Sequence, residues 1–282
     1  MSVLNAHVAL VSETSSVSFK RLSTVAAAIQ KQVTRDFGPL WSVNATVDAF
    51  DSLESVPVDY WPVIIKDDID QPGAAGYHTD DQGQPLALVQ FDSGWVLTAS
   101  HETLEMLADP FGNRTIAGDP PPQMPADGPK LDRVVYLVEV CDPCETITYT
   151  VNGQHLSDFI TDHYYDPDGG PGVRYSFRGK IKSPHTVLDG GYVSFGNPAD
   201  NHWYQIVVQG GQVQLADLGV LQASGGKSLR EQVDSKTRDH RKKQHYRVKP
   251  ATPVPADTDK VPFSDQSVKR AKNLRSFINR LK

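Results

Sequence analysis

The segment His101-Glu102-Thr103-Leu104-Glu105 holds the residues whose types and spacing best fit a chemical role. His101 and Glu105 are one helical turn apart, about 6 Å along the axis, so an imidazole nitrogen and a carboxylate oxygen can converge on one cation at about 2.0–2.2 Å. Glu102 then lies beside that cation. From there it can take a proton from metal-bound water, whose pKa a zinc ion lowers towards about 7, and deliver it to a leaving amine. The pattern predicts a Zn²⁺ site held by His101 and Glu105, with Glu102 as the catalytic base.

The carboxylates near this segment also favour a bound cation. Glu102, Glu105 and Asp109 share a helical sector of roughly 100° with His101, and no Lys or Arg lies among them. Like charges three or four residues apart destabilise a helix, and a negative charge near its C-terminus opposes the helix dipole. A cation would compensate for both effects. The alternative is an amphipathic helix whose carboxylates lie in water, with His101 at the boundary.

The segment resembles the His-Glu-x-x-His helix of the zincin metallopeptidases, with Glu105 where that family has its second His. The order of elements over residues 7–112 is also similar: a strand and a long helix precede several strands, the last of them an antiparallel edge strand that cradles the substrate. The active helix follows directly. The resemblance implies that His101 is a metal ligand, that Glu102 is the general base, and that the substrate is a peptide or protein.

The sequence does not fix the third metal ligand. Asp109 is about 12 Å along the axis from His101, so it would need the break at Pro110 to bend inward. Asp142 is the other residue that we favour, and Asp109 would otherwise orient His101 as an outer partner. The remaining candidates are Glu139, His155 and His163. His78, near a predicted hairpin, either lines the cleft or is a turn histidine hydrated by water, and the second interpretation is the commoner one.

The elements around the motif follow from hydrophobic periodicity and turn residues. We expect strands at 7–11, 43–50 and 61–65, a helix over 18–37 ended by Gly38-Pro39, a hairpin or loop joining 73–78 to 85–91, and the key helix over 97–109. A peptide would lie along an edge strand near 85–91. Further extended segments are expected at 133–141, 148–151, 172–177, 191–195 and 203–208.

These expectations give an α+β fold with one domain over residues 1–225. Residues 1–112 form its zincin-like part, a mixed sheet with two helices, and residues 113–225 form a loop-rich, β-leaning part. Gly225-Gly226 marks the start of a tail, residues 226–282, with a Pro-rich linker and a short terminal helix over 268–281.

The tail differs sharply in charge from the rest of the chain. From Lys227 onward there are 16 basic and 6 acidic residues, whereas the rest has 12 basic and 28 acidic residues. The tail would therefore dock on the acidic body or anchor the chain in a larger assembly through residues 227–282. In that second case the chain would be a zincin-like scaffold without catalysis. The acidic body argues against nucleic-acid binding.

Composition limits the setting of the protein. No apolar run is long enough for a membrane span, and the first residues lack the pattern of a secretion signal. We expect a cytoplasmic protein, or one exported without an N-terminal signal peptide. The two cysteines, Cys141 and Cys144, are too few for a disulfide scaffold or a structural zinc site and are interpreted as incidental thiols.

Overall fold

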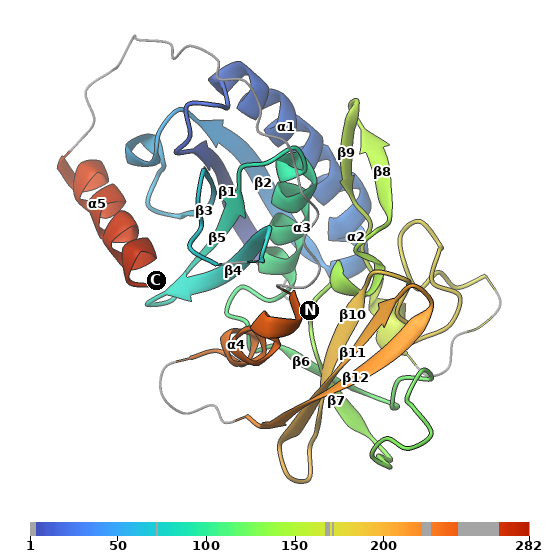
Figure 1. Cartoon of the computed structure of the whole chain (residues 1–282). Helices are drawn as coiled ribbons and strands as arrows, with labels where there is room; N and C mark the ends of the chain where they lie inside the picture. Colours follow the sequence, from blue (N-terminus) through green and yellow to red (C-terminus); the bar gives the residue numbers. More distant parts are fainter. Residues whose placement is uncertain are drawn as a thin grey trace. The chain divides into compact units, whose positions relative to one another are not determined.

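The computed structural model describes residues 4–71, 73–166, 170, 172–221, 227–241 and 265–281. They form an α+β protein, as predicted, with two compact units (Figure 1). The first unit takes its described residues from Met1–Pro110, Thr150–Leu156 and Arg241–Lys282, and the second from Phe111–Tyr149 and Ser157–His240. The division into one domain over residues 1–225 and a tail over 226–282 stays a prediction, and Gly225-Gly226 lies outside the described residues.

The first unit is built on a mixed five-stranded sheet. Its strands are β1 (Leu4–Ser12), β2 (Val43–Phe50), β3 (Tyr60–Lys66), β4 (Gly76–Asp81) and β5 (Gln84–Gln90), in the order β2-β1-β3-β5-β4. Four strands are parallel, and β4 pairs antiparallel with β5 at the edge. The predicted strands and the hairpin are confirmed. The predicted edge position of residues 85–91 is wrong, because β5 pairs with β3 on one side and β4 on the other.

The helix after β1 runs further than its sequence predicts. α1 (Phe19–Lys31) continues through a π-helical segment, Gln32–Phe37, into α2 (Gly38–Trp41). The expected stop at Gly38-Pro39 is therefore wrong. Pro39 occupies the first turn of α2, where its missing N–H costs no helical hydrogen bond. The helical path ends when Ser42 adopts a left-handed conformation, with φ 54°.

The predicted key helix is α3 (Trp95–Ala108), which packs against β3, β4 and β5 (Figure 1). Successive side chains of a strand point to opposite faces of the sheet, so Gly76 and His78 of β4 share one face and Tyr77 takes the other. A Cβ atom added to Gly76 would meet the side chains of Thr98 and Glu102, which identifies this face as the one towards α3. Tyr77 instead joins a core cluster on the opposite face.

That opposite face is covered by the C-terminal helix α5 (Asp265–Arg280), which confirms the predicted terminal helix. Ala271, Leu274 and Ile278 of α5 are buried in one cluster with apolar residues of β1, β3, β4 and β5. Arg270 donates to the carbonyl oxygens of Val56 and Tyr60. The helix is thus part of the core of the first unit.

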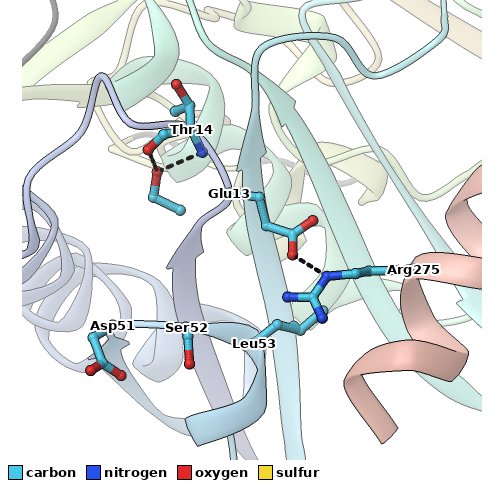
Figure 2. A pocket seen from close by; sticks show the side chains of 7 residues that line it. Glu13, Thr14, Asp51, Ser52, Leu53 and Arg275 are labelled. Atoms are coloured by element: carbon cyan, nitrogen blue, oxygen red, sulfur yellow. Dashed lines mark hydrogen bonds and ion pairs between the residues drawn. The ribbon is translucent and has the colours of Figure 1, made fainter. Parts of the chain in front are cut away.

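Arg275 of α5 also forms ion pairs with two glutamates of this unit (Figure 2). Its guanidinium donates to Glu13 at 2.7 Å and binds Glu54 through two nitrogens, and this contact lowers the pKa of Glu54. A cavity lies here, at the carboxyl ends of β1 and β2. It is lined by Ser12, Glu13, Thr14, Asp51, Ser52, Leu53 and Arg275, none of which belongs to α3.

The second unit contains an antiparallel sheet in the order β12-β11-β10-β7-β6. The strands are β6 (Thr115–Gly118), β7 (Val134–Leu137), β10 (Tyr192–Asn197), β11 (His202–Gln209) and β12 (Gln212–Val220). The strands predicted at 191–195 and 203–208 are confirmed, and the one predicted at 133–141 is shorter. Residues 172–177 contribute only an isolated bridge, Ile160 to Ser176, instead of a strand.

Three further elements are two short strands and a helix. β8 (Thr148–Val151) is confirmed and forms a two-stranded hairpin with β9 (Gln154–Ser157). Helix α4 (Leu229–Arg241) is not expected from the sequence, and its Arg230 forms a buried ion pair with Glu139 inside the second unit. Within the described part of the chain, no helix is both long and apolar enough to cross a membrane.

Candidate metal centre

The central turns of α3 bring His101, Glu102 and Glu105 together in the first unit. His101 Nε2 lies 3.2 Å from Glu105 Oε1, so these two side chains converge as their spacing predicts. Glu102 and Glu105 are 3% and 0% exposed, and Asp109 is also buried. The interpretation of α3 as a helix with its carboxylates in water is therefore wrong. The histidine retains the contact with solvent, because its side chain is 11% exposed.

A residue that we interpreted as a hydrated turn histidine completes this cluster. His78 lies in β4 and is 1% exposed, which contradicts that interpretation. Its Nδ1 atom is 3.6 Å from Glu102 Oε2 and 3.9 Å from Glu105 Oε2. One ligand atom from each of His78, Glu102 and Glu105 lies within 4.8 Å of the other two, so this buried group could hold a metal ion.

Gly76 allows β4 to come this close to α3. A Cβ atom at position 76 would lie 2.6 Å from Thr98 Cγ2 and 2.9 Å from Glu102 Cγ, both far inside normal contact distance. A glycine in a strand often marks such a close approach. A hydrogen bond also joins α3 to the π-helical segment: Ser100 of α3 donates to the buried side chain of Gln32 at 2.8 Å.

Asp109 takes part through its main chain. It caps α3, and its N–H donates to the Glu105 carbonyl at 2.8 Å. Its own carbonyl oxygen lies 3.0 Å from His78 Nε2. A carbonyl oxygen can only accept, so His78 Nε2 must be the donor. We expected Asp109 to be a third ligand or to orient His101; its main-chain carbonyl contacts His78.

The other predicted ligand, Asp142, belongs to the second unit. It is buried in the 3₁₀ turn Asp142–Cys144, and Cys141 and Cys144 are both buried and form no disulfide. Of the remaining candidates, Glu139 is paired with Arg230 in the same unit. His155 and His163 are exposed. None of these residues lies on α3 or β4.

The donor set fits a divalent cation. One imidazole nitrogen and carboxylate oxygens are typical ligands of zinc, and they also suit manganese or iron. Two ligands at 2.0–2.2 Å in a tetrahedral site lie about 3.3–3.6 Å apart. The distances of 3.6 and 3.9 Å from His78 Nδ1 are near this value, and they exceed the length of a hydrogen bond, about 2.7–3.2 Å.

Comparisons with protein families, curated proteins and solved structures found no match to this chain. The resemblance to zincins therefore depends on the motif in α3 and on the order of the elements before it.

Proposed function

We propose that this chain is a zinc-dependent hydrolase that cleaves peptide bonds, with its centre between α3 and β4. The observation that carries the proposal is the buried group of His78, Glu102 and Glu105 beside His101, because buried carboxylates next to imidazole nitrogens are a typical setting for a divalent cation. A cation bound there supplies Lewis acidity: it polarises the substrate carbonyl and lowers the pKa of a water molecule.

In this proposal His101 Nε2 and Glu105 hold the ion, and their 3.2 Å separation supports a shared contact. Glu102 is the general base. It follows His101 directly, its carboxylate is almost fully buried, and from this position it takes a proton from water and returns it to the leaving amine. In this proposal the substrate approaches the ion from the side of His101, whose side chain is partly exposed to solvent.

The strand order supports a peptide as the substrate. β4 is an antiparallel edge strand, as the zincin resemblance implies for the strand that binds the substrate, but β5 comes between β4 and α3 in the chain. A peptide can add to a sheet edge through main-chain hydrogen bonds, with specificity from alternate side chains. The peptide-binding strand in the proposal is β4, in place of the segment 85–91 that the sequence indicated.

The test is Glu102→Gln, which keeps the size of the side chain and removes its basicity. We expect about one zinc per chain, as in the wild type, and a loss of turnover of about 10²–10⁴-fold on unstructured peptides. Glu145→Gln, at an exposed glutamate, is the matched control and should keep full turnover.

Unchanged cleavage by Glu102→Gln would remove the catalytic role of Glu102. Loss of zinc from the variant would make Glu102 a ligand instead of the base. A wild type that binds zinc but cleaves no peptide would favour the scaffold without catalysis.

A further inference from the structure

The imidazole of His78 is held in one orientation by a hydrogen bond at Nε2. The ring is buried between β4 and α3, and Nε2 donates to the Asp109 carbonyl oxygen at 3.0 Å. A neutral imidazole carries one proton, so this bond leaves a lone pair on Nδ1. Histidines that bind metals usually donate their other ring N–H to a carbonyl or carboxylate in this way.

The lone pair on Nδ1 faces two carboxylate oxygens. Among the described residues, Nδ1 has no hydrogen-bond partner, and its nearest charged neighbours are Glu102 Oε2 at 3.6 Å and Glu105 Oε2 at 3.9 Å. The lone pairs of His78 Nδ1, Glu102 Oε2 and Glu105 Oε2 repel one another at these distances, and burial strengthens the repulsion. A cation among them would turn the repulsion into attraction.

We propose that His78 Nδ1 is a metal ligand, supplied by the edge strand in place of the second helical histidine that the motif lacks. The inference rests on the proposed function, because it assigns a further ligand to the same centre. Glu105 connects the two histidines: Oε1 lies beside His101 and Oε2 faces His78. The Asp109 carbonyl is the outer partner that orients the new ligand.

A different arrangement would leave the same distances without a metal. A doubly protonated His78 could form an ion pair with the two carboxylates, because both separations are below 4.0 Å. The two arrangements differ in what the ring is bound to: in one Nδ1 carries a proton, and in the other it carries the metal.

The first experiment compares zinc affinity by chelator competition in the wild type and in His78→Gln. Glutamine can keep a donor towards the Asp109 carbonyl, but it has no imidazole lone pair. We expect affinity to fall by at least about 100-fold, since changes to outer partners alone cost about 10–100-fold. His155→Gln, at an exposed histidine of the first unit, should bind zinc like the wild type.

The second experiment needs no variant and so does not depend on the folding of His78→Gln. Protein labelled with ¹⁵N is loaded with ¹¹³Cd²⁺ alone, and coupling between the two nuclei is measured by NMR. We expect a one-bond coupling at His78 Nδ1. Bound cadmium without this coupling would overturn the inference, as would wild-type zinc affinity in a folded His78→Gln.

The two proposals fail in different ways. If the wild type binds no divalent metal, both fall. If it binds zinc and His78 is uncoupled, only the assignment of His78 falls, and the hydrolase proposal keeps His101 and Glu105. If His78 is coupled but no peptide is cleaved, the ligand assignment stands and the hydrolase proposal fails.

Discussion

Glu105 lies between the two histidines of the candidate centre. It is fully buried, with one carboxylate oxygen 3.2 Å from His101 Nε2 and the other 3.9 Å from His78 Nδ1. A buried charge is costly unless it is paired or bound to a metal. A second histidine at position 105 would present one ring nitrogen, whereas a carboxylate can face both imidazoles. In the proposed centre, Glu105 can therefore contact both His101 and His78.

Asp158, in the second unit, gives a prediction about pH. It is fully buried, burial raises its pKa to about 6, and its Oδ1 accepts from the Arg178 backbone N–H. The folded state thus holds the proton more tightly than the unfolded chain, whose aspartate pKa is near 3.8. The contribution to stability is present below pH 3.8 and is lost as pH rises through about 6.

Asp158→Asn should remove this dependence, because asparagine stays neutral and can still accept the Arg178 N–H. The wild type should lose up to about 3 kcal/mol of unfolding free energy between pH 4 and 7 relative to this variant. Urea denaturation followed at several pH values measures the difference. Asp162→Asn, at an exposed site, serves as the control. Parallel pH profiles for the wild type and Asp158→Asn would contradict the prediction.

At the scale of elements, the patterns that extend over several residues are predictable. Alternation identifies β2, and spacing of three and four residues identifies α1 and α3, because each pattern records which face is buried. The end of α1 was missed because the π-helical segment shifts Pro39 into a new first turn. Such a shift depends on tertiary packing, including the contact of buried Gln32 with Ser100.

Elements with weak patterns were missed. β6 has four residues, and α4 has a single clearly buried apolar residue, Val233, among many charged ones. His78 could have been found by combining two signals. Gly76 allows close approach, and strand alternation places His78 on the same face as Gly76. The partner of that face, α3, is known only once the sheet order is known.

Helix α5 gives a prediction at this scale. Leu274→Ala should lower the unfolding free energy by about 2–5 kcal/mol, because Leu274 is 4% exposed in the core cluster that also contains Ile64 and Leu88. Val268→Ala shortens an apolar side chain on the same helix that is 46% exposed. This substitution should change the unfolding free energy by no more than about 0.5 kcal/mol. Chemical denaturation compares them. Equal effects of the two substitutions would show that α5 does not pack as described.

For the whole molecule, the contrast between a basic tail and an acidic body now has a partial structural explanation. Arg275 binds Glu13 and Glu54, so this part of the tail docks on the first unit. Arg270 binds main-chain carbonyls there as well. Segment 242–264 of the tail lies outside the described residues, and the anchoring of the chain in an assembly through residues 227–282 stays a prediction.

The α+β class was predictable for the whole molecule because it needs only the order of elements. The proposed ligand set was not fully predictable, because its members come from β4 and α3 and depend on the order of strands in the sheet. Asp109 was weighed by its distance from His101 along the helix axis, and the sequence does not show where Asp142 lies in space. Their side chains stay predicted ligands, whereas His78 has the geometry that the proposal uses.

The most direct test of the account is elemental analysis of the purified wild type beside His101→Ala and Glu105→Ala, all dialysed without chelator. His155→Ala is the control at an exposed histidine. The account predicts about one zinc per chain in the wild type and the control, little or none in the two variants, and a zinc-dependent rise in melting temperature only where zinc binds. A wild type that holds no metal, and whose melting temperature does not change with added zinc, would contradict the metal centre.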